Sequence, residues 1–364
     1  METSGLETSG LNVHDVTETV RTFADFKEHE CVLVASEPAS GLHGVIAIHD
    51  RTLGPALGGC RMWTYATEAA ALTDALRLSR KAALAGLPLG GGKAILIGDS
   101  KCDKTEPLFR AFGRFVEALQ GRYITAEDVG TSVREMDWVA KETAHVTGSS
   151  QTGGNPSPMT ALGVFLGMKI AARHRLGQET LQGRRVAVQG LGHVGYELCK
   201  LLHREGASLV VTDLDAAACA RAAQELQADI AEPDEIYAVE ADVFAPCALG
   251  AILRDETLPN LQCKIVAGSA NNQLQTDRHG EALRKRGILY APDYVINVGG
   301  LIYVAAEVLA DSLGTDIEAA IHRALAALDE IFERAERENM ATNRVADRIA
   351  GERLAKAKAA STAS

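Results

Sequence analysis

The stretch that most constrains the fold runs from Arg184 to Asp213. It reads as an apolar strand, Arg184-Arg-Val-Ala-Val-Gln189, then Gly190-Leu-Gly-His-Val-Gly195, then a helix and a second apolar strand that ends in an acid. Glycines in this pattern permit a tight turn and let a pyrophosphate approach the N-terminus of the helix. A lone Gly-x-Gly-x-x-Gly is weak evidence, but the complete strand–turn–helix–strand–acid frame predicts a dinucleotide-binding domain.

The acid that ends this unit predicts which cofactor is bound. Asp213 follows Gly190 by 213 − 190 = 23 residues, where a carboxylate can hold the 2′-hydroxyl of an adenine ribose and repel a 2′-phosphate. We therefore expect NAD rather than NADP. The expected cofactor-binding residues of this unit are Gly190, Leu191, Gly192, His193, Val194, Gly195, Tyr196 and Asp213.

A second glycine-rich run places Lys81 and Lys93 on either side of an apolar turn, with Lys93 directly after three glycines. A phosphate-binding P-loop is excluded, since Leu87 stands where its first glycine should be and Ala94 where its Ser or Thr should be. A glycine turn with a solvated lysine is the common alternative. The third interpretation is a substrate site, because bare backbone admits a small molecule and a lysine in apolar surroundings near another cation can act as a base.

The composition narrows the class of protein. The 364 residues are 46% hydrophobic and 23% charged, which suits two globular domains with their own cores. The net charge of −11 disfavours a nucleic-acid partner, and no apolar run approaches the length of a membrane span. The seven cysteines form no Cys-x-x-Cys pair and show no zinc-ligand spacing with the histidines. We expect reduced thiols, a cytoplasmic protein and no metal.

The pattern along the chain predicts an α/β protein of two domains. Residues 1–11 repeat Glu-Thr-Ser-Gly-Leu, lack the basic and apolar regions of a secretory signal, and are expected to form a disordered tail. The N-terminal domain is expected over residues 12–150, joined by a C-terminal helix from about 336 to 364, and the dinucleotide-binding domain over 151–335. A break rich in Gly, Ser and Pro at 145–158 is the expected hinge.

Apolar periodicity and capping residues give the expected elements, with a glycine-rich loop at 51–61. Helices are expected at 13–29, 68–85, 105–119, 159–174, 196–205 and 317–357, and strands at 31–35, 44–49, 94–97, 122–125, 184–189, 207–212, 243–246, 265–267 and 287–290. The strand at 122–125 leads into Glu127 and Asp128. Acids at the carboxyl end of a strand stand where open α/β sheets keep their chemistry.

Six motifs stand in the order found in the amino-acid dehydrogenases, the superfamily that acts on glutamate, leucine, phenylalanine and valine. They are Leu57-Gly-Gly59, Gly90-Gly-Gly-Lys93, Thr125-Ala-Glu-Asp-Val-Gly130, Ala245-Pro-Cys-Ala-Leu-Gly250, Gly268-Ser-Ala-Asn-Asn272 and Ala291-Pro-Asp-Tyr-Val-Ile-Asn-Val-Gly-Gly300. The chain resembles the leucine/valine/phenylalanine/tryptophan branch, and the leucine dehydrogenases most. The resemblance extends over about residues 20 to 355, and six motifs in one order are highly specific.

The resemblance implies reversible oxidative deamination of an L-amino acid with NAD and water, giving a 2-oxo acid, ammonia and NADH. It implies a substrate-binding and oligomerisation domain separated by a cleft from a Rossmann-type domain, in a homo-oligomer, often an octamer. Lys93 matches the catalytic lysine that activates water, Asp128 the acid that moves protons at the amine, and Lys81 the lysine that binds the substrate carboxylate. The other matched positions are Gly58 and Gly59 at the carboxylate end, Leu57, Ala126, Val298 and Leu301 in the side-chain pocket, and Asn271, Asn272 and Asn297 near the nicotinamide and substrate.

The chain departs from the family just before Lys81. Relatives usually carry about four extra residues there, whereas Arg77-Leu-Ser-Arg80 here joins Lys81 directly. A loss of about one helical turn, ~3.6 residues, either leaves the site intact through a shift of register or displaces Lys81. A catalytic enzyme and a non-catalytic NAD-binding relative are therefore both open, and intact Lys81, Lys93 and Asp128 favour catalysis.

The matched pocket positions are all apolar and carry no charge, so a substrate with a side-chain carboxylate such as glutamate is disfavoured. Leucine, isoleucine and valine fit such a pocket. The gap left by the missing turn also leaves open an aromatic substrate, phenylalanine or tryptophan. One methylene in an apolar pocket changes binding by only ~1–3 kcal/mol, so several amino acids are expected to be accepted.

Overall fold

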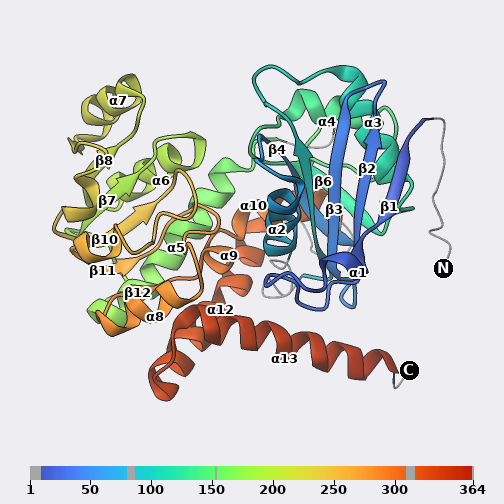
Figure 1. Ribbon diagram of the computed structural model, residues 1–364. Helices are drawn as coiled ribbons and strands as arrows, with labels where there is room; N and C mark the ends of the chain where they lie inside the picture. The colour runs from blue at the N-terminus through green and yellow to red at the C-terminus, as the bar shows by residue number, and fades with distance from the viewer. Residues whose placement is uncertain (1–9, 80–86, 152–153, 309–315, 363–364) are drawn as a thin grey trace. The chain divides into compact units, whose positions relative to one another are not determined.

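The computed structural model describes residues 10–79, 87–151, 154–308 and 316–362, which fall into two compact units (Figure 1). The first unit takes Met1–Asn155, Val304–Ala310 and Arg353–Ser364, and the second takes Pro156–Tyr303 and Asp311–Glu352. The boundary between Asn155 and Pro156 lies in the stretch that the sequence indicates as a hinge. Within the described ranges, no helix is both long and apolar enough to cross a membrane.

A six-stranded mixed sheet forms the centre of the first unit, in the order β1-β2-β3-β5-β4-β6. Its strands are β1 (Asn12–Asp15), β2 (Cys31–Glu37), β3 (Leu42–Asp50), β4 (Ala56–Trp63), β5 (Gly90–Ile97) and β6 (Tyr123–Glu127). The pairs from β1 to β5 are antiparallel, while β4 runs parallel to both β5 and β6. The carboxyl ends of β4, β5 and β6 therefore meet at one edge, and Asp128 follows β6 there.

Helices cover both faces of this sheet, because side chains alternate between the two faces along each strand and apolar side chains lie on both. On one face, Cys60 and Met62 of β4 pack in a core with α3 (Glu106–Glu117) and α4 (Val133–Val139). On the other, Ile95 of β5 packs against α2 (Glu68–Leu78). The side chain of Thr67 caps α2 by accepting from the Ala70 N–H at 3.2 Å, as expected for a threonine before an acidic first turn.

The second unit is a six-stranded parallel sheet in the order β12-β11-β10-β7-β8-β9. Its strands are β7 (Arg185–Gln189), β8 (Ser208–Thr212), β9 (Asp229–Ile230), β10 (Ala241–Pro246), β11 (Cys263–Val266) and β12 (Leu289–Tyr290). Numbered from β7, the order is 3-2-1-4-5-6, the arrangement of a doubly wound dinucleotide-binding fold. This confirms the predicted fold class. The topological switch falls between β7 and β10, directly beside the glycine turn.

The other described helices are α1 (Thr17–Val20), α5 (Ser157–Leu176), α6 (His193–Arg204), α7 (Ala216–Leu226), α8 (Arg278–Lys285), α9 (Asp293–Ile296), α10 (Gly299–Val308), α12 (Ile317–Glu338) and α13 (Thr342–Thr362). Short 3-10 turns lie at Ile236–Ala238 and Leu258–Asn260. In the second unit, α5 packs against α6 and α12. Gly167 of α5 lets α9 and α12 approach closely, since a Cβ there would stand 2.4 Å from the side chain of Ile296 and 3.1 Å from that of Leu328.

Three expectations, for a helix, for a tail residue and for a loop, are wrong. The expected helix over 13–29 is largely replaced by β1 and the single turn α1, because pairing of Val13 with Ala35 of β2 outweighs a weak helix propensity. Leu11, placed in the tail by the sequence, is buried in the core of the first unit. The segment expected to be helical over 317–357 is helical, as α12 and α13, which separate at Asn339, whose φ of 51° ends α12 in a left-handed cap.

The expected glycine-rich loop at 51–61 is the third error, since β4 begins at Ala56 and occupies the middle of the parallel part of the sheet. The glycines before Lys93 also belong to a strand, β5, rather than to a turn. Glycines usually weaken strands, but here neighbouring atoms fill the space that a side chain would need: the Asp50 carbonyl oxygen at Gly90 and the Tyr123 ring at Gly92. The end of the helix expected over 68–85 lies partly outside the described residues, which stop at Ser79 and resume at Leu87.

Candidate active site

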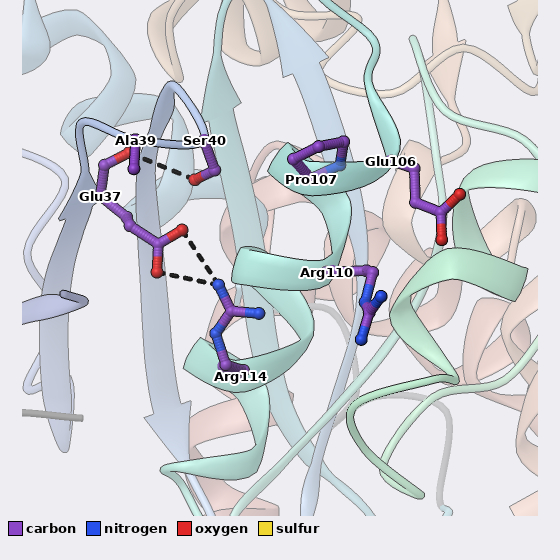
Figure 2. A pocket seen from close by; sticks show the side chains of 7 residues that line it. All are labelled: Glu37, Ala39, Ser40, Glu106, Pro107, Arg110 and Arg114. Atoms are coloured by element: carbon purple, nitrogen blue, oxygen red, sulfur yellow. Dashed lines mark hydrogen bonds and ion pairs between the residues drawn. The ribbon is translucent and has the colours of Figure 1, made fainter. Parts of the chain in front are cut away.

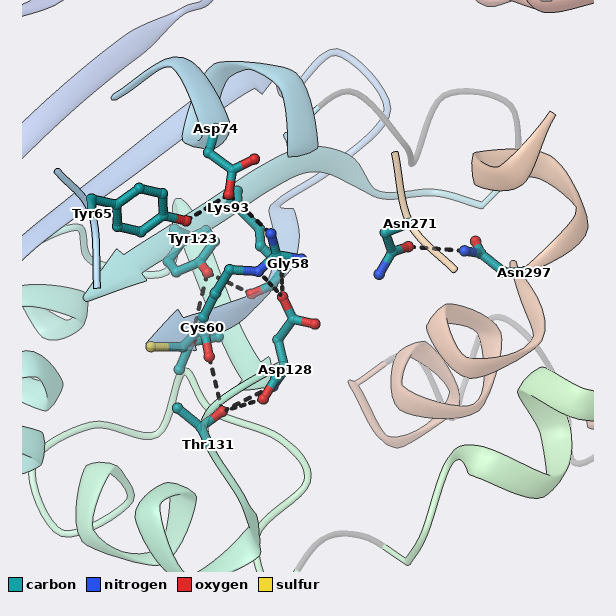
Figure 3. Close-up of polar contacts among 12 residues, drawn as sticks. Gly58, Cys60, Tyr65, Asp74, Lys93, Tyr123, Asp128, Thr131, Asn271 and Asn297 are labelled. Carbon is teal, nitrogen blue, oxygen red and sulfur yellow. Dashed lines mark hydrogen bonds and ion pairs between the residues drawn. The ribbon is translucent and has the colours of Figure 1, made fainter. Parts of the chain in front are cut away.

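Lys93 and Asp128 form an ion pair where β6 ends, level with the middle of β4 and β5 (Figure 3). Lys93 is a buried residue of β5, and Asp128 directly follows β6. Their side chains are only 9% and 15% exposed, so water screens the pair poorly. The structure therefore brings together the two residues that the sequence predicts as catalytic.

The backbone around this pair has no room for side chains at two glycines of β4. A Cβ on Gly58 would stand 1.7 Å from the carbonyl oxygen of Gly92, and one on Gly59 would stand 2.8 Å from the Cβ of Asp128. The Tyr123 hydroxyl donates a hydrogen bond to the Gly58 carbonyl oxygen and fixes that strand from the adjoining β6. The backbone of β4 at Gly58 and Gly59 thus lies directly beside Lys93 and Asp128.

The turn after β6 fixes the backbone of Asp128. The Thr131 hydroxyl accepts from the Asp128 N–H at 2.9 Å and lies 2.8 Å from the Cys60 carbonyl oxygen, to which it donates. This contact ties the turn to the neighbouring strand β4. Leu57 and Ala126, the expected pocket residues on β4 and β6, are both buried beside this region, with Gly59 paired to Ala126.

Arg61 of β4 is a charged neighbour of the pair that sequence reasoning missed. Its Nη1 donates to Oδ2 of Asp74 on α2 at 2.9 Å, and its Nε lies 3.5 Å from Oδ2 of Asp128. The Tyr65 hydroxyl donates to the same oxygen of Asp74 at 2.6 Å. A chain of charges therefore runs from Asp74 through Arg61 and Asp128 to Lys93.

Burial and charge oppose each other at these groups. Burial disfavours ionisation of Asp128, but the charges of Lys93 and Arg61 outweigh it and hold the pKa of the carboxyl well below its usual value. Burial also opposes the charge on Arg61, yet Asp128 and Asp74 raise its pKa. Burial raises the pKa of the Cys60 thiol far above its normal range, so this cysteine is neutral. The site holds a carboxylate between two cations.

A strand pattern would have revealed Arg61. Side chains alternate along a strand, so Arg61 points to the same face as Gly59, which abuts Asp128, while Cys60 points into the core. The expectation of a loop over 51–61 leaves no strand on which this alternation would appear. Gly58 and Gly59 carry no apolar side chains, so the alternating apolar pattern that indicates a strand is absent from the sequence here.

The glycine turn in the second unit fits a dinucleotide. Gly190 has φ of 100°, and a Cβ there would stand 2.7 Å from the Ala248 nitrogen, so only glycine is accommodated. A Cβ on Gly195 would stand 2.0 Å from the Gly190 carbonyl oxygen. Gly192, in contrast, has nothing within 4 Å and begins α6 without a side-chain cap. The helix N-terminus is thus open to a phosphate group.

The acid after β8 lies at this turn. Oδ2 of Asp213 accepts from the Leu191 N–H at 2.6 Å, and its Oδ1 accepts from the Asp215 N–H at 2.9 Å. Both contacts orient the carboxylate beside the glycine loop. Tyr196 is buried in α6, and the Arg221 guanidinium stacks 4.0 Å from the centre of its ring. His193 is exposed and Val194 half-buried in the first turn of α6.

The expected asparagines form a second polar group in the second unit. Nδ2 of Asn297 donates to Oδ1 of Asn271 at 2.8 Å and to the Ser269 carbonyl oxygen at 3.1 Å (Figure 3). Asn272 has φ of 52°, and its N–H donates to Asp293. Val298 is buried, and Leu301 is half-buried on α10. The substrate positions expected at 297, 298 and 301 therefore belong to a different compact unit from Lys93.

Lys81, the expected carboxylate-binding lysine, lies outside the described residues. A surface pocket elsewhere on the first unit contains Glu37, Ser40, Glu106, Arg110 and Arg114 (Figure 2). Its arginines are neutralised, Arg114 by Glu37 at 2.8 Å and Arg110 by Glu142 at 2.6 Å. Within the described residues, no group of His, Cys, Asp or Glu is arranged to hold a metal ion.

Comparisons with known proteins agree with both units. The dimerisation-domain model of the Glu/Leu/Phe/Val dehydrogenases matches residues 29–145, and the Glutamate/Leucine/Phenylalanine/Valine dehydrogenase model matches 154–222 and 213–361. A leucine dehydrogenase of Thermoactinomyces intermedius is 54% identical over 337 residues, 90% of this chain and 91% of its own length.

Solved structures show the same similarity. The crystal structure of L-tryptophan dehydrogenase from Nostoc punctiforme matches with a TM-score of 0.78 at 44% identity, over 94% of this chain and 99% of that chain. A hetero-hexameric glutamate dehydrogenase from Thermus thermophilus matches with a TM-score of 0.73 at 26% identity, over 87% of this chain and 84% of that chain. With two matching family models and relatives aligned along nearly its whole length, this chain belongs to the glutamate/leucine/phenylalanine/valine dehydrogenase family and is an amino-acid dehydrogenase.

Proposed function

We propose that this enzyme catalyses the reversible, NAD-dependent oxidative deamination of a branched-chain L-amino acid, leucine first and also valine and isoleucine. The observation that carries the proposal is the buried Lys93–Asp128 pair on a floor of glycine backbone. A lysine and a carboxylate at such a site can move protons to and from an amine and a water molecule. The high identity to a leucine dehydrogenase supports the aliphatic substrate.

In this proposal, Lys93 first releases its proton to solvent. Asp128, still ionised at that stage, then accepts a proton from the substrate ammonium, which leaves the amine free to donate electrons. NAD bound to the second unit would supply the acceptor for the hydride on the substrate Cα. Neutral Lys93 takes a proton from the water that attacks the resulting iminium carbon. Asp128 returns its proton to the leaving amine, and the new hydroxyl gives its own proton to solvent as the ketone forms. Lys81 holds the substrate carboxylate, whose backbone neighbours are Gly58 and Gly59.

We assign the cofactor to NAD on the fit of the glycine turn and Asp213. The open N-terminus of α6 receives the pyrophosphate, with contacts along 190–196. A carboxylate held beside the turn at 2.6 Å from Leu191 N favours a ribose 2′-hydroxyl and repels a 2′-phosphate. Asn271, Asn272 and Asn297 are assigned to the nicotinamide and substrate end, and their mutual hydrogen bonds orient the amides.

We assign contact with the substrate side chain to Leu57 and Ala126 of the first unit and to Val298 and Leu301 of the second. All four are apolar, so a charged side chain would lose its hydration there without gaining a partner. An aromatic amino acid is the second candidate, favoured by the 44% identity to the solved tryptophan dehydrogenase. We further propose a cytoplasmic homo-oligomer, an octamer by family resemblance, whose substrate and oligomerisation domain is 12–150 with the C-terminal helix and whose NAD domain is 151–335.

The substrate assignment is tested by NADH formation with leucine, isoleucine, valine, phenylalanine, tryptophan and glutamate on one preparation. We expect kcat/KM to be highest for the aliphatic amino acids and lowest for glutamate. An aromatic preference above about tenfold, or ~1.4 kcal/mol, would assign the pocket to an aromatic ring instead. No turnover of any substrate by a protein that still binds NADH would refute catalysis.

A further inference from the structure

The carboxylate of Asp128 has two cations on one oxygen. Lys93 Nζ bonds to Oδ2, and the Nε of Arg61 lies 3.5 Å from that same atom. This Nε is buried and makes no hydrogen bond, although an unsatisfied buried donor is costly. The other side of the Arg61 guanidinium is held by Asp74 at 2.9 Å. Arg61 thus offers Asp128 a donor that the resting arrangement does not use.

The proposed reaction needs such a donor. When Lys93 gives up its proton it ceases to be a cation, and the Asp128 carboxylate, only 15% exposed, loses the charge that compensates it. An arginine keeps its charge at any working pH and presents several donors in a fixed plane. A small rotation of the carboxylate towards Arg61 would replace the bond to Lys93 without exposing either group.

We propose that Arg61 is a positioning residue that holds the Asp128 carboxylate, charged and oriented, after Lys93 has released its proton and before Asp128 takes one from the substrate ammonium. The inference rests on the proposed function, because it assumes that Lys93 is the base. Arg61 acts only through Asp128 and touches no substrate. Asp74 and Tyr65 serve to hold the guanidinium in place.

A purely structural alternative makes a different prediction. The Arg61–Asp74 pair also links β4 to α2, and loss of this link would disturb the fold whatever residue stands at 128. A positioning role through Asp128 requires that the effect of Arg61 disappear once the carboxylate is gone. A double-mutant cycle separates these two cases, because it measures the coupling between the two residues.

The experiment compares wild type, Arg61→Gln, Asp128→Asn and the double variant in leucine oxidation, with NADH affinity and thermal unfolding measured for each. We expect Arg61→Gln to lower kcat by roughly tenfold or more with little change in KM for leucine, because the lost contact acts after binding. In the Asp128→Asn background, the same substitution should change kcat by less than about twofold. Arg61→Lys, which keeps the charge, should recover most of kcat.

The matched control is Arg114→Gln, which removes another arginine from a carboxylate, Glu37, in the surface pocket of Figure 2. Its kcat should equal that of wild type.

Two outcomes would overturn the inference. One is an equal loss of kcat on Arg61→Gln with Asp128 and with Asn at position 128, and the other is an Arg61→Lys variant as impaired as Arg61→Gln. If Arg61→Gln does not fold, the cycle is run with Asp74→Asn, which weakens the hold on the Arg61 guanidinium. A loss of kcat that is equal with and without the Asp128 carboxylate would again overturn the inference. Wild-type turnover in Asp128→Asn would instead overturn the proposed function.

Discussion

Gly58 and Gly92 are in direct backbone contact: a Cβ on Gly58 would stand 1.7 Å from the Gly92 carbonyl oxygen and 3.2 Å from the Lys93 nitrogen. The two glycines belong to the paired strands β4 and β5. Their contact sets how close β4 lies to the backbone that carries Lys93. The position of the lysine therefore depends on the absence of a single carbon atom on the neighbouring strand.

Gly58→Ala should destabilise the protein and abolish most activity, because the added methyl group forces β4 away from β5. Overpacking of this kind typically costs ~1–3 kcal/mol, which thermal unfolding will show as a lower Tm. Gly351→Ala is the control, since a Cβ there meets nothing within 4 Å in helix α13, and we expect an unchanged or slightly higher Tm. A Gly58→Ala variant as stable and active as wild type would refute the contact.

Lys93→Ala should lower kcat by about 10²–10⁴, the usual effect of losing a general acid or base. The folded state should persist, which NADH affinity and circular dichroism will check. Lys104→Ala is a suitable control. Lys104 forms an ion pair of 3.4 Å with Glu135, and this pair includes neither Lys93 nor Asp128. Turnover close to wild type in Lys93→Ala would exclude it as the catalytic base.

Asp213→Ala should reduce the preference for NAD over NADP, measured as the ratio of kcat/KM values, by roughly an order of magnitude or more. The physical reason is the loss of a carboxylate that repels the 2′-phosphate. The variant also frees the Leu191 N–H, so NADH affinity should fall as well. A wild-type enzyme that already prefers NADP would show that Asp213 does not have this role.

The carboxyl of Asp128 predicts a particular acid dependence of stability. Its pKa is lowered in the folded state despite burial, because of Lys93 and Arg61. The carboxylate therefore contributes stability above the unfolded pKa of about 3.9, and the contribution is lost as the pH falls through the folded value. Denaturation of wild type and Asp128→Asn should give a difference in unfolding free energy that is constant from pH 6 to 8. Loss of one partner of a buried ion pair typically costs ~3–5 kcal/mol, and we expect a difference of that size.

Below about pH 4 the difference in unfolding free energy between wild type and Asp128→Asn should become smaller. The reason is that protonation of Asp128 in the unfolded chain begins to favour unfolding of the wild type. Arg114→Gln is the control for the effect of low pH on other ion pairs, because it breaks the pair between Arg114 and Glu37 and leaves Lys93 and Asp128 in place. A difference that grows as the pH falls would have the wrong sign and would show that Asp128 is not held ionised by its neighbours.

The dinucleotide unit was predictable because its signal is local. The turn from Gly190 to Gly195 and the acid at 213 appear in one continuous stretch, and the structure places Asp213 against Leu191 as that pattern requires. The Lys93–Asp128 pair could be expected only through the family resemblance, since it joins two strands separated in sequence by α3. Nothing near either residue in the sequence indicates that they meet.

The error at β4 has a physical explanation. A strand is normally read from alternating apolar side chains, but Gly58 and Gly59 contribute none, and the space above them is taken by Gly92 and Asp128. The reason for the glycines is thus a long-range contact that no local pattern reveals. The same error concealed Arg61, whose partners Asp74 and Asp128 come from α2 and the end of β6.

The glycine floor also affects how such an enzyme can evolve. Gly58, Gly59 and Gly92 are each blocked by an atom of another strand or of Asp128 within 2.8 Å of a Cβ, so mutation has almost no permitted outcome there. The neighbouring positions Leu57 and Ala126 do carry side chains, which are buried beside that backbone and can differ in size and shape. A change of substrate in such an enzyme is therefore expected to arise from substitutions at positions like Leu57 and Ala126. The backbone that holds Lys93 and Asp128 is expected to stay the same.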